Sequence, residues 1–311
     1  MSDRYKGIFF ASFAAILWGF LAIALKVSLK SLSPVEISWV RFIVAFSFLS
    51  VYYLFYNRSA FIIFKKPPAA LILAGLLLGL NYLGFITGIH FTSPGTAQIF
   101  IQLGPIFLTL AAFIFFKEKV SLKQVAGIII AFAGLSVFYY EQIPALVGDI
   151  HTFNKGILWL LAGAVCWACY AILQKGLVKR HNPMQLNLIL FAVPAVLYIP
   201  FIHFSRFSGI STGYLLLLLF LGLNTLGAYG SLAFALKYLE ANKISIILIQ
   251  NPIITFVVLM VLQQMQVTWI KADQLNLIAL IGAAMVITGG ILTVLSGRKK
   301  NTANNLKKVD H

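Results

Sequence analysis

The chain has 311 residues, of which 60% are hydrophobic and only 10% are charged, and its formal net charge is +16. A soluble domain of this length carries about a quarter charged residues. The composition therefore excludes a soluble globular protein and indicates an integral membrane protein. The basic excess does not indicate a nucleic-acid partner, because the Lys and Arg residues lie in short loops between apolar segments, where they report membrane orientation.

Ten apolar segments are long enough to cross a membrane, whose hydrocarbon core of about 30 Å needs about 20 helical residues. In chain order they cover residues 7–28, 35–56, 69–90, 95–116, 122–140, 156–178, 184–204, 213–236, 244–262 and 274–296. The first begins after Arg4 and Lys6, as a signal peptide does. It is too long for one and lacks a small-residue cleavage site, so we expect a retained transmembrane helix.

The distribution of basic residues predicts the orientation of these spans. With the N-terminus inside, 17 Lys and Arg residues fall on the cytoplasmic side, and the outside loops hold only Lys30, Lys155, Arg206 and Lys271. Cytoplasmic loops carry the excess of Lys and Arg. We therefore predict that both termini are cytoplasmic, in a bacterial inner membrane.

The chain contains the same sequence pattern twice. Residues 79–84 read Gly-Leu-Asn-Tyr-Leu-Gly and residues 222–227 read Gly-Leu-Asn-Thr-Leu-Gly, while residues 6–42 and 155–191 agree without gaps at 11 of 37 positions. Each copy holds five spans, an odd number, so the second copy must enter the membrane upside down. Such inverted repeats are typical of secondary transporters, whose site lies at the repeat interface near the membrane midplane. The prediction is an all-α membrane protein with repeats at 1–148 and 149–297 and a basic tail at 298–311.

Asn81 and Asn224 stand at matching points of the two repeats, each near the middle of its span. An amide in hydrocarbon costs several kcal/mol unless another group satisfies it. We therefore expect these two side chains to approach each other across a central cavity and to contact the solute.

The fourth span carries more polar groups on one helical face. Gln98, Gln102 and Pro105 recur at intervals of four and three residues, followed by Thr109. The corresponding residues of the second repeat are Gln250, Asn251 and Pro252. The prolines are expected to break their helices and free a backbone carbonyl inside the membrane. The alternative role of the amides is hydrogen bonding between helices.

Aromatic side chains are expected to form the cavity wall. Trp18 and Trp167 lie in the middle of their spans and not at the interfaces where Trp is usually enriched. Tyr82, Tyr170 and Tyr229 join them as candidates for solute contact. Ordinary packing within the bundle is the alternative for each of these rings.

Lys26, Arg41 and Lys175 fall within span ends. Lys26 and Lys175, near span ends, are predicted to form an electropositive rim that attracts carboxylate or phosphate groups, or else to extend toward lipid headgroups. Arg41 is a candidate gate on the outer side, paired with Glu36. No Asp or Glu lies deep in a span, although proton-driven transporters usually keep a carboxylate or His there. Coupling therefore stays open, and His90, near a span end, is the one candidate.

The order of Leu17-Trp18-Gly19, Lys26, Pro34 and Arg41-Phe42 resembles the start of an EamA-type repeat, as do a proline in the fourth span and the pair Glu118-Lys119 after it. The resemblance covers residues 6–296 and implies a transporter of the drug/metabolite superfamily built from two inverted five-helix repeats. The second copy departs from this pattern. Leu190 replaces Arg41, and Gln264-Met265-Gln266 replaces the Glu118 region, so the charged roles are not expected to be symmetric.

We predict a secondary transporter that moves a small polar or amphipathic metabolite by alternating access. The resemblance points to an amino acid or derivative, and a nucleobase, nucleotide-derived cofactor or sugar phosphate is the alternative. An intramembrane enzyme would need a nucleophile beside its base or a metal cluster, and a scaffold would not need duplicated central amides. Cys166 and Cys169 are interpreted as packing residues, and no cofactor or metal is expected. The expected partners are the solute and the lipid bilayer, with a monomer as the oligomeric state.

Overall fold

The structure is a computed structural model, and it describes residues 3–108, 121–142, 150–239, 244, 247–249, 251–267 and 276–295. All regular elements in these ranges are helices. Seven of them are long and apolar enough to cross a membrane, and two shorter apolar helices follow near the C-terminus. The all-helical membrane fold is confirmed, whereas the count of ten spans stays a prediction, because the fourth span is described only as far as Leu108.

The helices follow the predicted segments closely. The first repeat contains α1 (Asp3–Ser28), α2 (Pro34–Tyr56), the short 3₁₀ helix η1 (Arg58–Phe64), α3 (Ala69–Phe91), α4 (Pro94–Phe100) and α6 (Leu122–Gln142). The second contains α7 (Ile150–Leu177), α8 (Pro183–Tyr198), the 3₁₀ helices η2 (Ile199–Phe201) and η3 (Phe204–Phe207), α9 (Thr212–Tyr238), α11 (Asn251–Gln264) and α12 (Leu277–Leu295). Helix α8 ends at Tyr198, six residues before the predicted end of the seventh span, and η2 extends the apolar segment to Phe201.

The duplicated sequence starts the second helix of each repeat in the same way. Ser33 precedes Pro34, and its hydroxyl accepts from the backbone N–H of Glu36 while the Glu36 carboxylate accepts from the backbone N–H of Ser33. In the second repeat Asn182 precedes Pro183, and its side chain accepts from the backbone of the first turn of α8. Such capping side chains satisfy N–H groups that have no partner within the helix.

The packing of the helices shows that the second repeat is inverted. Lys26, near the end of α1, reaches the end of α3, so these two helices end on the same side. Gly84 of α3 lies against Gly163 of α7, and Gly88 lies against Gly156, so the later residues of α3 meet the earlier residues of α7. The α7 helix therefore runs opposite to α3 and to α1, its counterpart in the first repeat.

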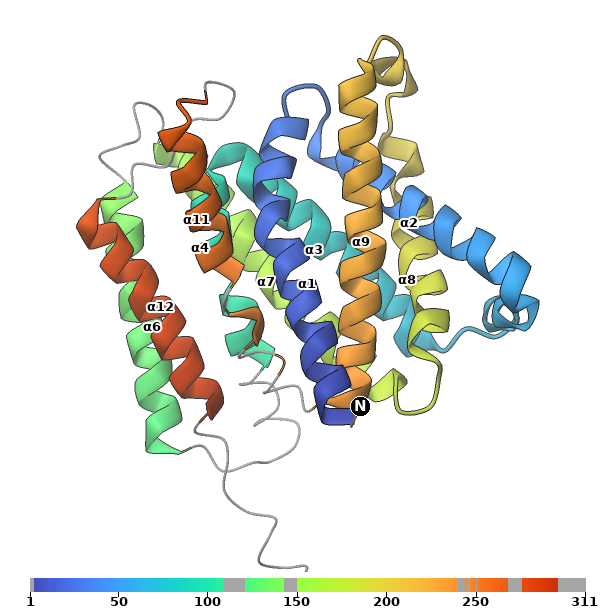
Figure 1. Cartoon of the computed structure of the whole chain (residues 1–311), viewed down its shortest axis with the longest axis horizontal. Coiled ribbons are helices and arrows are strands. Elements are labelled where there is room, and N and C mark those ends of the chain that lie inside the picture. The colour runs from blue at the N-terminus through green and yellow to red at the C-terminus, as the bar shows by residue number, and fades with distance from the viewer. Residues whose placement is uncertain are drawn as a thin grey trace, which may run out of the picture.

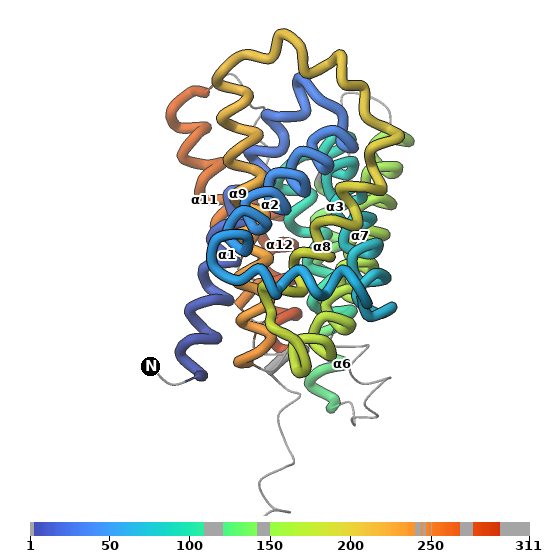
Figure 2. The backbone as a smooth tube through the Cα atoms, turned by 90° about the vertical axis from the view of Figure 1, so that its right-hand side faces the viewer, coloured from blue at the N-terminus to red at the C-terminus, as the bar shows by residue number. Residues whose placement is uncertain are grey.

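Each close helix pair takes one member from each repeat. The α3 helix packs on α7, α1 on α9, α2 on α8 and α6 on α12 (Figure 1). The α6–α12 pair stands at one side of the bundle, and backbone meets backbone there where Gly134 faces Gly282. The connection from α8 to α9 crosses the end of the bundle opposite the N-terminus (Figures 1 and 2).

Candidate solute-binding site

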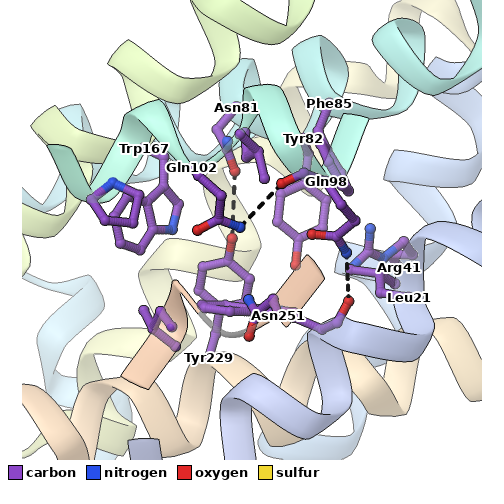
Figure 3. A pocket seen from close by; sticks show the side chains of 14 residues that line it. Leu21, Arg41, Asn81, Tyr82, Phe85, Gln98, Gln102, Trp167, Tyr229 and Asn251 are labelled. Atoms are coloured by element: carbon purple, nitrogen blue, oxygen red, sulfur yellow. Dashed lines mark hydrogen bonds between the residues drawn. The ribbon is translucent and has the colours of Figure 1, made fainter. Parts of the chain in front are cut away.

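A cavity that is partly open to the outside lies among the helices of both repeats (Figure 3). Of the fourteen described residues that line it, the first repeat supplies ten and the second repeat four. They are Trp18, Leu21, Arg41, Asn81, Tyr82, Phe85, Gln98, Ile101, Gln102 and Pro105, together with Trp167, Tyr229, Leu248 and Asn251.

Four of the five predicted aromatic side chains line this cavity and contact one another. Trp18 is edge-on to Tyr229, with ring centroids 5.2 Å apart, and edge-on to Trp167 at 6.4 Å. The Tyr82 ring lies 5.5 Å from that of Tyr229. Aromatic rings in such tilted and edge-on arrangements make a rigid apolar surface. The result is a continuous wall to which both repeats contribute.

Tyr170 does not line the cavity. Its ring packs 5.8 Å from Tyr229, its side chain is fully buried, and its hydroxyl donates to the side-chain oxygen of Gln174 one turn later. Tyr170 therefore supports Tyr229 from behind, which is the packing alternative considered for these rings.

The two central asparagines are not equivalent in the structure. Asn81 lines the cavity, donates to the Gly163 carbonyl of α7 at 2.9 Å and accepts from the Tyr229 hydroxyl at 3.4 Å. Asn224 is buried outside the cavity and donates to the Leu17 carbonyl of α1 at 2.9 Å. The expectation that the two amides face each other across the cavity is wrong for Asn224, because its amide is directed into the α1–α9 contact.

The fourth span places both of its predicted amides on the cavity. Gln98 donates to the Trp18 carbonyl at 3.0 Å, and Gln102 donates to the Gln98 carbonyl at 3.1 Å (Figure 3). The helical stretch is interrupted at Ile101 and Gln102, just before Pro105, and Pro105 itself lines the cavity. The buried Oε1 atom of Gln102 has no hydrogen-bond partner in the described residues.

The matching part of the second repeat contributes less. Asn251 lines the cavity, and its buried Oδ1 atom has no partner in the described part of the chain. Pro252 lies in the first turn of α11, where a helix tolerates proline, and does not line the cavity. Gln250 lies outside the described residues, as do Thr109 and the Glu118-Lys119 pair.

Neither predicted rim lysine borders the cavity. The ammonium group of Lys26 donates to backbone carbonyls at the C-terminal end of α3, and that of Lys175 donates to carbonyls at the C-terminal end of α9. These carbonyls have no partners within their helices and carry the negative end of the helix dipole. The lysines therefore satisfy helix ends, and the expected electropositive rim is not formed.

Arg41 lies in the wall of the cavity. Its side chain is only 1% exposed, its Nε donates to the Thr225 hydroxyl at 3.0 Å, and its guanidinium carbon lies 4.2 Å from the centre of the Tyr82 ring. The expected pair with Glu36 is not formed. Residues five apart on a helix point about 140° away from each other, and the Glu36 carboxylate binds Ser33 and, at 3.3 Å, Arg206.

Sequence reasoning missed the apolar lining residues Leu21, Phe85, Ile101 and Leu248, and it missed Thr225 as the partner of Arg41. Two signals were present in the sequence. Phe85 follows Asn81 by one helical turn and so shares its face. Thr225 occupies the place of Tyr82 in the repeated Gly-Leu-Asn motif. The sequence offers no signal that distinguishes Leu21, Ile101 and Leu248 from the apolar residues that face lipid.

Comparisons with known proteins agree with this architecture. The model of the EamA-like transporter family matches residues 5–140 and again 154–295. An "Uncharacterized transporter" of Haemophilus influenzae is 29% identical over 93% of this chain and 94% of its own length. The "Uncharacterized inner membrane transporter YhbE" of Escherichia coli (strain K12) is 28% identical over 94% of this chain and 92% of its own. A solved crystal structure with 17% identity covers 96% of this chain and all of its own, with a TM-score of 0.68, which shows the fold alone.

Proposed function

Because the chain belongs to the EamA-like transporter family, we propose that it is a secondary transporter that moves a small amphipathic metabolite, an amino acid or close derivative, by alternating access. The observation that carries the proposal is the central cavity lined by both repeats. In transporters built from inverted repeats, the solute binds at the repeat interface, and the repeats then move relative to each other. The inner-membrane name of the Escherichia coli relative supports a bacterial inner membrane as the location.

The chemistry of the cavity favours an amphipathic solute. Aromatic rings supply apolar contact area, while Asn81, Gln98, Gln102 and Asn251 present amide groups beside them. Amides offer both donors and acceptors without a net charge. An amino acid with an apolar side chain has the matching combination, because its backbone is polar and its side chain is not.

No Asp, Glu or His lines the cavity within the described part of the chain. Proton-coupled transporters place such groups where a proton and the solute compete or cooperate. The described lining therefore favours exchange or facilitated diffusion over proton coupling through this cavity.

The experiment uses the purified full chain in two steps. The first measures its unfolding temperature with a panel of amino acids, amino-acid derivatives, nucleobases and sugar phosphates, because a ligand that binds the folded state raises this temperature. The second measures counterflow, in which proteoliposomes preloaded with an unlabelled hit take up the labelled compound. We expect one or more amino acids or derivatives to pass both steps. If nothing in the panel shifts unfolding or supports counterflow, the proposed function is wrong for these solute classes.

A further inference from the structure

We propose that Arg41 binds the carboxylate of the transported solute, so that the substrate class is a monocarboxylate such as an amino acid zwitterion. This inference rests on the proposed function and deepens it. Its basis is a buried guanidinium group in the cavity wall that has no counter-charge among the described residues.

The surroundings of Arg41 leave its charge uncompensated. Its Nε bonds to one hydroxyl, its plane lies near the Tyr82 ring, and its buried Nη2 has no hydrogen-bond partner in the described residues. A buried unpaired charge is strongly unfavourable, and buried charged groups in proteins are normally paired. A guanidinium group without an anion on the wall of a cavity therefore indicates that the anion arrives with the ligand.

The carboxylates of the described residues are all engaged elsewhere. Asp3 pairs with Lys6, Glu36 binds Ser33 and Arg206, and Glu141 accepts from Asn276. None of the three lies within ion-pair distance of Arg41. A carboxylate carried by the solute would supply the two oxygens that a guanidinium group binds side by side.

The single cation favours a carboxylate over a phosphate. A phosphate monoester carries between one and two negative charges at neutral pH, and a second cation would be expected beside it. Lys26 and Lys175 are bound to carbonyls at helix ends away from the cavity. On the same cavity, Gln102 and Asn251 each hold a carbonyl oxygen that has no partner among the described residues, which suits an ammonium group.

Packing alone does not account for an arginine at this position. Leu190 occupies the corresponding place in the second repeat and is fully buried. The same fold therefore accepts an apolar side chain at this register. Removing a buried charge that has no counter-charge among the described residues is expected to leave the empty protein at least as stable, as often happens when binding groups are replaced.

The test compares each acid with its uncharged analogue. The probe pairs are L-leucine with L-leucinamide, L-phenylalanine with L-phenylalaninamide, and benzoate with benzamide, and phenyl phosphate is added as a second anion. Affinities are measured by tryptophan fluorescence for the wild type, Arg41→Leu and Arg41→Lys. Arg58→Gln is the matched control, because Arg58 is an exposed arginine on η1, outside the cavity.

We expect the wild type and Arg58→Gln to bind the acid about 10- to 100-fold more tightly than the amide, as a charge-assisted hydrogen bond would give. Arg41→Leu should lose this preference while keeping its affinity for the amides, and its unfolding temperature without ligand should equal or exceed that of the wild type. Arg41→Lys should retain part of the preference, because it keeps the charge but not the planar fork.

Several results would overturn the inference. Equal affinity of the wild type for acids and amides would exclude a carboxylate role for Arg41, and this result does not depend on any variant folding. A lower unfolding temperature of Arg41→Leu with an unchanged acid preference would show that Arg41 stabilises the fold and does not bind the carboxylate. Tighter binding of phenyl phosphate than of benzoate would show that Arg41 binds a phosphate group, of a solute or of a lipid headgroup, and not a carboxylate. If the protein transports a solute but shows no preference for acids, the inference about Arg41 is wrong and the proposed function stands. If it shows neither binding nor counterflow, the proposed function is wrong.

Discussion

Lys26 and Lys175 perform the same task at opposite ends of the bundle. Lys26 donates to the carbonyls of Ile89 at 2.8 Å and Thr92 at 2.7 Å, at the end of α3. Lys175 donates to the carbonyls of Leu236 and Leu239 at the end of α9, which is the counterpart of α3. Each lysine thus ties the first helix of its repeat to the third, and the inversion places one such tie on each side of the membrane.

The first prediction concerns these ties. Lys26→Met and Lys175→Met should each lower the free energy of unfolding by about 1 kcal/mol, because a cation at a partly buried helix C-terminus contributes this much. Thermal unfolding in detergent measures the effect, with Lys65→Met in the exposed turn after η1 as the control. An unchanged unfolding temperature, combined with a loss of solute affinity from one side only, would restore the rim hypothesis.

The two repeat asparagines give a matched comparison. Asn81→Ala and Asn224→Ala should each destabilise the protein by about 1 kcal/mol, since each loses its hydrogen bond to a backbone carbonyl of another helix. Only Asn81→Ala should also weaken ligand-induced stabilisation, because only Asn81 lines the cavity and accepts from Tyr229. An equal loss of ligand response in both variants would contradict the inequivalence seen in the structure.

The contact between α3 and α7 should be intolerant of a single added carbon. A Cβ at Gly84 would lie 2.7 Å from the Trp159 carbonyl oxygen and 3.0 Å from the Gly163 Cα, and backbone cannot move aside as a side chain can. Gly84→Ala should therefore lower the free energy of unfolding by about 1–3 kcal/mol. Gly213→Ala is the control, because a Cβ there meets no atom within 4 Å. Equal unfolding temperatures for the two variants would show that the helices can separate at no cost.

The ion pair between Glu36 and Arg206 joins the two repeats, and its members should not matter equally. The Arg206 side chain is 52% exposed, so Arg206→Gln should cost less than about 1 kcal/mol. The Glu36 side chain is fully buried and also caps α2, so Glu36→Ala should cost about 1–3 kcal/mol. A double-mutant cycle by thermal unfolding separates the pair from the cap. A coupling energy as large as the whole Glu36→Ala effect would assign the stability to the pair.

The predicted topology can be tested at the two ends of the chain. Ser2→Cys and Asn304→Cys, each placed in a background with Cys166→Ala and Cys169→Ala, should resist a membrane-impermeant thiol reagent in intact cells. Both should react once the membrane is opened. The reason is the excess of basic residues on the side that holds both termini. Reaction of either cysteine in sealed cells would show that the corresponding terminus lies outside the cell.

The positions of the helices were predictable because the length of an apolar segment is a direct consequence of membrane thickness. The inversion was predictable as well, since the predicted odd number of spans per copy leaves no other orientation. Ser33-Pro34 and Asn182-Pro183 carry a further local signal, because a capping side chain before proline is typical of a helix start. These features depend on local sequence alone or on simple counting.

The partners of individual polar groups were not predictable. The spans are apolar on nearly all sides, so their sequences do not reveal which face meets lipid and which meets another helix. Asn224 was therefore assigned to the cavity although it bonds to Leu17, and Arg41 was assigned to a gate although it lies beside Tyr82. Each assignment needs the rotation of one helix relative to its neighbour, which only the packed structure provides.

Among the described residues, ten from the first repeat and four from the second line the cavity, and this inequality bears on the transport cycle. If the repeats exchange conformations, as inverted-repeat transporters do, the opposite-facing cavity would be lined mainly by the second repeat. Leu190, Thr225 and Ala228 would then stand where Arg41, Tyr82 and Phe85 stand now. The solute would move from a cavity lined by a cation and aromatic rings to a roomier cavity with a more aliphatic lining. The protein would then bind the solute more tightly at one face of the membrane and release it at the other. Dissociation constants measured separately at the two faces of oriented vesicles should therefore differ. Equal values would rule out this difference in affinity between the two faces.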